Sequence, residues 1–295
     1  MKLLRFGNDQ LGVLDGDDIV DISSLAASSS AGRLHNWIES ASGVKLADLI
    51  AREDLPRLPR AATRTLAPLP LPPKIIAAPV NYLDHKAEMK VEHTVADLGI
   101  FLKARTSVIG PDETVVLPYT DKRFDQEAEL AIIIGTRSRN LSRDEAMSAV
   151  FGYMCLFDMS MRSTEDRSTR KSFDTFTPLG PVVVTKDEIP DPSRLHMTCW
   201  VNGTVRQDTS LGDLIFDVPT LVSYASSVMT LEPGDVIATG TPAGVGGVHD
   251  GDTLAMEITG LDRLEVRVSS TGAIAYADRE GAHLDPARLG ETAEV

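Results

Sequence analysis

Three acidic residues in apolar surroundings are the first feature of this sequence that could carry out chemistry. Glu127 and Glu129 are two residues apart in RFDQEAELAIIIG (residues 123–135), whose second half is apolar and predicts a buried strand. Alternate side chains of a strand point to the same face, so the two carboxylates should lie side by side. A third acid, Asp158, lies in the apolar stretch FGYMCLFDMSM.

Three explanations are open for Glu127 and Glu129. They can face solvent at the end of a strand, they can pair with Lys122 and Arg123, or they can hold a cation. Burying an unpaired carboxylate costs on the order of several kcal/mol, and the third acid makes a shared divalent cation the preferred explanation. Ligands that are all oxygen suit Mg²⁺, Mn²⁺ or Ca²⁺ rather than zinc.

A histidine and a glutamate further upstream have the spacing of a catalytic pair. In APVNYLDHKAEM (residues 78–89), His85 and Glu88 are three residues apart, so one helical turn places them on the same face. A carboxylate beside an imidazole orients the ring and raises its basicity, which a general base needs. The alternative is a surface helix of mixed charge.

A basic segment and a glycine-rich loop are the remaining features of this kind. Arg162, Arg167, Arg170 and Lys171 lie close together in MRSTEDRSTRKSFDTFTPLGP (residues 161–181). A solvated loop is the default for such charges, but local positive charge would also hold an anionic substrate, and Lys171 is the one expected to be fixed in place. GDVIATGTPAGVGG has no phosphate-loop spacing, so we expect a strand that ends in a loop close to a ligand.

Composition limits the class of protein in which these residues act. The chain has 295 residues, is 42% hydrophobic and 24% charged, and carries a net charge of −14, so nucleic acid and anionic membranes are poor partners. The longest apolar runs are too short to cross a bilayer or to form a signal peptide. Cys155 and Cys199 are far apart and are expected to be buried free thiols, which favours a cytoplasmic protein.

The elements that must position these residues are mainly strands. Short strands separated by Gly and Asp turns predict a small β-rich domain over residues 1–66, and prolines then favour an extended linker over residues 67–73. We expect a catalytic domain over residues 74–275, a mainly β (α+β) roll or barrel, followed by a polar tail over residues 276–295. The helices should be few, namely residues 34–40, 45–51, 142–150, where Ser142 and Glu145 form a capping box, and 218–229.

The order of these motifs resembles the fumarylacetoacetate hydrolase superfamily. The resemblance rests on NYLDHKAEM, FLKARTSVIGP, FDQEAELAIIIG, FDMSMR, KSFDTFTPLGP, VNGTVRQD and MTLEPGDVIATGTPAGVG, which cover roughly residues 74–270. It implies a β-roll catalytic domain, usually a homodimer, that binds Mg²⁺ or Mn²⁺ and a small anionic 2-oxo acid. The roles that it implies are metal ligation by Glu127, Glu129 and Asp158, catalysis by His85, Glu88 and Lys171, and substrate binding by Arg162, Thr241 and Tyr82.

The chemistry that the resemblance implies is cleavage of a carbon–carbon bond in a 2,4-dioxo acid of the acylpyruvate or fumarylpyruvate type, through a metal-bound enolate. His85 would take a proton from water and Lys171 would stabilise the oxyanion. The alternatives in this superfamily are a decarboxylase, isomerase or hydratase acting on oxaloacetate or a 2-oxo dienedioate in aromatic catabolism. A non-catalytic 2-oxo acid binder is a further alternative, whereas a serine hydrolase is disfavoured because no G-x-S-x-G motif is present.

The sequence departs from the superfamily pattern after Arg162. Ser163 and Glu165 stand where many members have Asp and Gln. If Glu165 lies unpaired near the substrate, its charge should select against acids that carry a second, distal carboxylate. Pairing with Arg162, Arg167 or Arg170 would remove this effect.

Overall fold

The chain folds mainly as β structure, as the sequence predicts. The computed structural model describes residues 1–40 and 44–280. Part of the predicted polar tail, residues 281–295, therefore lies outside the described residues. In the part that is described, no helix is long and apolar enough to cross a membrane.

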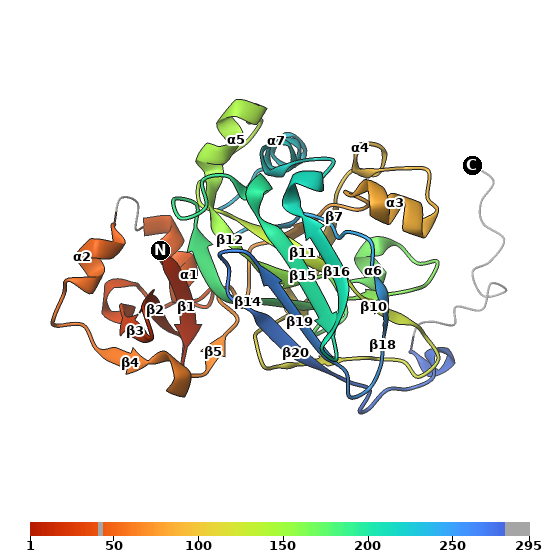
Figure 1. The fold of residues 1–295 in the computed structure, drawn as a ribbon, viewed down its shortest axis with the longest axis horizontal. Helices are drawn as coiled ribbons and strands as arrows, with labels where there is room; N and C mark the ends of the chain where they lie inside the picture. The colour runs from red at the N-terminus through yellow and green to blue at the C-terminus, as the bar shows by residue number, and fades with distance from the viewer. Residues whose placement is uncertain (41–43, 281–295) are drawn as a thin grey trace.

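One large mixed sheet, called here the main sheet, forms the centre of the molecule (Figure 1). Its strands in the described chain run in the order β4-β3-β2-β1-β14-β12-β11-β17-β6-β7, with β5 paired to β1 and β8 paired to β14. Their bounds are β1 Lys2–Phe6, β2 Gln10–Asp15, β3 Asp18–Asp21, β4 Arg57–Pro59, β5 Thr65–Leu66, β6 Ile75–Ala77, β7 Phe101–Lys103, β8 Val108–Ile109, β11 Ala128–Ile134, β12 Val150–Phe157, β14 Thr177–Thr185 and β17 Val236–Ala238.

Two smaller sheets complete the β structure of the described residues. The second sheet has the order β16-β15-β19-β20-β9, and a third has the order β13-β10-β18. Their bounds are β9 Thr114–Val116, β10 Phe124–Gln126, β13 Ser160–Met161, β15 His196–Val201, β16 Thr204–Ser210, β18 Gly246–Val248, β19 Thr253–Ile258 and β20 Leu264–Ser269. In Figure 1 the second sheet lies beside the main sheet, with β15 and β19 next to β11 and β14 in the view.

Both faces of β11 are covered, which explains its continuous apolar run. Leu130 and Ile132 belong to the core that the main sheet shares with the second sheet. Ala131 and Ile133 belong to the core on the opposite face, which also contains Trp37. A strand buried on both faces has no solvent side on which polar residues would be favoured.

The helices are short; in Figure 1, α5 and α7 lie at the top of the view and α3 and α4 at its upper right, outside the sheets. Their bounds are α1 Arg33–Ser40, α2 Leu46–Ile50, α3 Leu83–Met89, α4 Val95–Leu98, α5 Arg143–Ala149, α6 Arg167–Arg170 and α7 Val218–Val228. The predicted capping box is confirmed at α5, where Ser142 accepts a hydrogen bond from the Glu145 amide and the Glu145 carboxylate accepts one from the Ser142 amide.

The N-terminal strands are joined directly to the rest of the molecule. β1 pairs with β14 in antiparallel register, Leu3 opposite Val183, so residues of the predicted N-terminal domain extend the main sheet. The proline-rich residues 67–73 connect β5 to β6. The division of the chain into separate domains stays a prediction.

Candidate metal centre and active site

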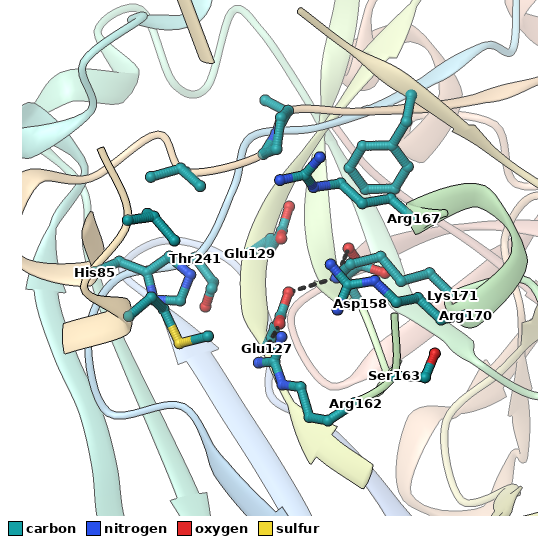
Figure 2. A pocket seen from close by; sticks show the side chains of 16 residues that line it. His85, Glu127, Glu129, Asp158, Arg162, Ser163, Arg167, Arg170, Lys171 and Thr241 are labelled. Carbon is teal, nitrogen blue, oxygen red and sulfur yellow. Dashed lines mark hydrogen bonds and ion pairs between the residues drawn. The ribbon is translucent and has the colours of Figure 1, made fainter. Parts of the chain in front are cut away.

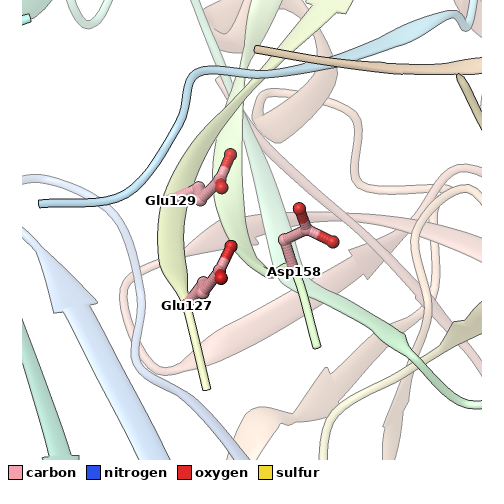
Figure 3. Close-up of side chains that lie close together, drawn as sticks. All are labelled: Glu127, Glu129 and Asp158. Atoms are coloured by element: carbon pink, nitrogen blue, oxygen red, sulfur yellow. The ribbon is translucent and has the colours of Figure 1, made fainter. Parts of the chain in front are cut away.

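Three buried carboxylates converge where β11 and β12 meet the third sheet (Figure 3). Glu127 lies between β10 and β11, Glu129 lies in β11, and Asp158 follows β12, which is antiparallel to β11. The Asp158 amide donates a hydrogen bond of 2.8 Å to the Glu127 carbonyl, which fixes the two residues side by side. One carboxylate oxygen from each residue lies within 4.8 Å of the others, and the three residues are 5%, 2% and 1% exposed.

The solvent-facing explanation of these acids is therefore wrong, and so is pairing with the basic residues next to them in sequence. Arg123 pairs with Asp125 instead, at 2.7 Å. Lys122 places its ammonium over the ring of Tyr276, 3.9 Å from the ring centroid.

Distant cations neutralise two of the three acids. Lys171 Nζ donates to Glu127 Oε2 and to Asp158 Oδ2, each at 2.6 Å, and also to the Ser160 hydroxyl. Arg162 donates to the other oxygen of Glu127 at 2.8 Å. Burial alone would raise the pKa of Glu127, but the charges of Lys171 and Arg162 outweigh it and lower that pKa. Burial likewise opposes the charge of Lys171, yet the three carboxylates raise its pKa.

Lys103 is a site residue that local sequence patterns do not identify. It ends β7, is fully buried, and donates from Nζ to Asp158 Oδ1 and, at 2.8 Å, to the Phe176 carbonyl. The only feature of the sequence that could have indicated a role for Lys103 is its position at the end of a short apolar strand. Its partner is 55 positions away in the chain, so no local spacing could identify the pair.

Glu129 is the one acid of the three with no ion-pair partner in the described chain. Its carboxylate accepts a hydrogen bond of 2.7 Å from the Gly240 amide and forms no ion pair within the described residues. Gly240 has φ of +90°, and a Cβ there would lie 2.8 Å from the Cβ of Asn81, so glycine is needed to bring this amide close. Burial raises the pKa of Glu129 well above its ordinary value, and the negative charges of Asp158 and Glu127 add to the effect.

This arrangement fits a divalent cation. A buried carboxylate with a raised pKa lacks positive charge, and the three acids offer only oxygen atoms at close range. Hard cations such as Mg²⁺ and Mn²⁺ take ligands of this kind. A cation held by Glu127, Glu129 and Asp158 would supply the missing charge.

The structure also brings His85 and Glu88 together, on α3. The Nδ1 atom of His85 lies 3.4 Å from Glu88 Oε2, and the other oxygen of Glu88 accepts a hydrogen bond of 2.9 Å from the Gly244 amide. Glu88 therefore links α3 to the glycine-rich loop after β17. His85 is 6% exposed and lines the same cavity as the three acids.

The cavity has a volume of about 280 Å³, enough for a small organic acid. In Figure 2, His85 and Thr241 lie to the left of Glu127 and Glu129, Arg167, Arg170 and Lys171 lie to their right, and Arg162 lies below Glu127. Thr241 lines the cavity, and its hydroxyl is held by the Ala128 carbonyl at 3.0 Å and by Gln207 at 2.7 Å. Tyr82 is buried next to α3 but is not among the lining residues, and its hydroxyl has no hydrogen-bond partner within residues 1–40 and 44–280.

Glu165 is paired, although not with an arginine of its own segment. Its Oε1 atom accepts a hydrogen bond of 3.0 Å from Arg279, which lies 114 positions away. The Arg279 guanidinium also lies over the rings of Phe173 and Tyr276. Ser163 lines the cavity, whereas Glu165 does not, and the two side chains are hydrogen bonded at 3.2 Å.

The fold and this site define a fumarylacetoacetate hydrolase type of enzyme, and the chain belongs to that family. Residues 74–269 match the family model described as fumarylacetoacetate (FAA) hydrolase C-terminal. This confirms the resemblance and the β-roll fold expected from it.

The chain is similar over most of its length to a maleylpyruvate hydrolase of Aquipseudomonas alcaligenes, with 40% identity over 92% of this chain and 100% of the relative. It is also similar to the crystal structure of maleylpyruvate hydrolase from Sphingobium sp. SYK-6 in complex with manganese(II) ion and pyruvate. The TM-score is 0.82 with 40% identity, over 92% of this chain and 99% of that one. An oxaloacetate tautomerase of Xenopus laevis is 36% identical over 83% of this chain and 81% of the relative.

Proposed function

We propose that the protein is a divalent-metal-dependent hydrolase that cleaves the carbon–carbon bond of a 2,4-dioxo acid, giving pyruvate and a carboxylic acid. The observation that carries this proposal is Glu129, a buried carboxylate that forms no ion pair within the described residues, in one cavity with His85 and Lys171. The likeness to two maleylpyruvate hydrolases supports the choice of substrate class. Homodimer formation and a cytoplasmic location stay predictions.

The proposed metal ligands are Glu127, Glu129 and Asp158, and Mg²⁺ or Mn²⁺ is the proposed ion. When bound, such an ion supplies positive charge that attracts the carboxylate and 2-oxo group of the substrate and stabilises negative charge in the transition state. The described residues supply the remaining functions, which are the base, the hydrogen-bond donors and the walls of the cavity.

His85 is the proposed general base. Its Nδ1 atom faces Glu88, which leaves Nε2 to take a proton from water. The water oxygen then bonds to the C4 carbonyl carbon of the substrate. The C3–C4 bond breaks, and its electron pair stays on the three-carbon fragment, which takes up a proton and leaves as pyruvate.

Lys171 is the proposed donor to the oxyanion that forms at C4. Its three N–H groups are engaged by Glu127, Asp158 and Ser160, so it can serve the substrate only if one of these hydrogen bonds is released. Arg162 stays paired with Asp125 and Glu127, which holds the wall of the cavity next to the acids.

The test is pyruvate formation from acetylpyruvate and fumarylpyruvate, followed with lactate dehydrogenase and NADH. Protein stripped with EDTA should be inactive, and Mg²⁺ or Mn²⁺ should restore activity. Absence of pyruvate from every 2,4-dioxo acid tried, with the metal shown to be bound by elemental analysis, would refute the proposal. Full activity of a preparation shown to be free of metal would refute the role of the ion.

A second candidate is proton transfer on oxaloacetate, and the likeness to an oxaloacetate tautomerase favours it. His85 and Lys171 could move a proton at C3 without any water attack. The decay of enol absorbance with oxaloacetate, measured beside pyruvate and CO₂ release, separates tautomerisation and decarboxylation from hydrolysis.

A further inference from the structure

Two arginines on α6 face the cavity and form no ion pair with any carboxylate that the structure describes. Arg167 and Arg170 both line the cavity, and both are partly buried. Within the described residues neither forms an ion pair, and the Nε atom of Arg170 is buried with no hydrogen-bond acceptor. Burial and the nearby charges of Arg162 and Arg167 lower the pKa of Arg170. A buried N–H donor without an acceptor is costly, so this wall of the cavity is suited to an anion.

The acids next to α6 in sequence form no ion pair with these arginines within the described residues. Glu165 pairs with Arg279, as described above. Asp166 is the N-cap of α6, and its carboxylate accepts a hydrogen bond of 2.8 Å from the Ser168 amide. Both acids are thereby held by other groups, and neither lines the cavity.

The charge of the cavity points to a substrate with more than one negative group. Its lining includes the three carboxylates and the four cations Arg162, Arg167, Arg170 and Lys171, so with all seven groups ionised it carries one net positive charge. A divalent ion would raise this excess to three, in a protein whose net charge is −14. A 2,4-dioxo acid with one carboxylate offsets one of these positive charges. An acid with a second carboxylate offsets two.

We propose that Arg167 and Arg170 bind the distal carboxylate of a dicarboxylic 2,4-dioxo acid, opposite the end that the metal centre holds. This inference rests on the proposed function for the chemistry, but the arginine pair and its lack of partners are independent of it. Guanidinium groups match a carboxylate with two parallel hydrogen bonds, and such charge-assisted bonds are among the strongest in proteins. Because Glu165 is paired with Arg279, the charge of Glu165 does not select against substrates with two carboxylates. We therefore infer that the site prefers such dianions.

The first test compares fumarylpyruvate, which has a distal carboxylate, with acetylpyruvate, which has none. Arg167→Gln and Arg170→Gln should each lower kcat/KM for fumarylpyruvate about 10-fold or more, and the double variant about 100-fold. The value for acetylpyruvate should change less than about threefold, which also shows that the variants fold. Arg194→Gln is the matched control, because Arg194 is exposed, does not line the cavity and forms no ion pair within residues 1–40 and 44–280. Equal losses for both substrates, or no loss in the double variant, would overturn the inference.

The second test does not depend on turnover. 2-Oxoheptanedioate and 2-oxoheptanoate differ only in a distal carboxylate, and their dissociation constants can be measured by calorimetry with saturating Mg²⁺. We expect the wild-type protein to bind the diacid at least 10-fold more tightly, and the double variant to lose this preference. If no 2,4-dioxo acid is hydrolysed, the proposed function fails while this comparison still decides the inference. Equal binding of the two acids by the wild-type protein would contradict it.

Discussion

Replacing Glu129 with glutamine should have opposite effects on the metal-free and the metal-loaded protein. Glutamine keeps the size of the side chain and an oxygen that can accept the Gly240 hydrogen bond. It removes the one carboxylate of the three that has no ion pair in the described structure. The metal-free variant should therefore be more stable than the wild-type protein, and its response to Mg²⁺ or Mn²⁺ should be lost or strongly reduced.

The size of the effect follows from the distances. Two unit charges no more than 4.8 Å apart repel each other by at least about 3.5 kcal/mol at an effective dielectric constant of about 20. Lys171 pairs with both neighbouring acids and offsets part of this repulsion. We expect a net gain of about 1 to 3 kcal/mol for the metal-free variant, which for a chain of this size is a rise in Tm of about 2 to 6 °C.

The gain should increase as the pH rises. Because the pKa of Glu129 is raised in the folded protein, the folded state holds a proton that the unfolded chain has lost. Wild-type stability therefore falls as the pH rises above the ordinary range of a glutamate and towards the raised pKa. Glutamine does not titrate, so the difference between the variant and the wild-type protein widens with pH.

The assay is thermal unfolding of both proteins with EDTA and with saturating Mg²⁺ or Mn²⁺ at several pH values. Asp235→Asn is the matched control, because burial raises the pKa of this carboxyl too, but its two oxygens accept hydrogen bonds from Lys74 and from the Glu232 amide that asparagine would lose in part. It should lower Tm with and without metal and leave the metal-induced shift unchanged. A Glu129→Gln variant that is destabilised in EDTA as much as this control, or that keeps the wild-type metal shift, would refute the reasoning.

Three further predictions concern other parts of the structure. His85→Ala should keep the metal-induced rise in Tm but lose about 10²- to 10⁴-fold in hydrolysis rate; hydrolysis at the wild-type rate would remove His85 from the mechanism. Cys155 and Cys199 are buried free thiols, and burial raises both pKa values, that of Cys199 to about 12. Neither should react with a thiol reagent at pH 8 until the protein unfolds, and rapid labelling of the native protein would contradict their burial. Arg279→Gln should free the charge of Glu165 and lower kcat/KM for fumarylpyruvate more than for acetylpyruvate. Adding Glu165→Gln to that variant should recover kcat/KM for fumarylpyruvate. If it does not, the pair acts through the fold alone.

Much of the candidate site could be predicted from local spacing. The alternation of a strand places Glu127 and Glu129 on one face, and the pitch of a helix places His85 beside Glu88. The order of the motifs predicted the family, because an ordered series of motifs is far more specific than any one of them. The sequence also predicted a mainly β fold, since short strands and turn residues alternate along most of the chain.

The partners of these residues depend on the tertiary structure. Arg279 reaches Glu165 across 114 positions, and Lys103 reaches Asp158 across 55. The apolar pattern of β1 could not reveal that it would pair with β14 and extend the main sheet. Hydrophobic pattern specifies which face of an element is buried, but not which distant element will cover it.

The sequence by itself determined which residues could do chemistry, because residue type and spacing of two to four positions follow from the geometry of strands and helices. Only the tertiary structure decided which of them lack an ion-pair partner within the described residues. Cations from distant segments pair with Glu127 and Asp158. In the described chain, Glu129, Arg167 and Arg170 have no ion-pair partner of opposite charge. That difference arises because ion pairs are set by proximity in space, and proximity between segments far apart in the chain is fixed only when the sheets pack.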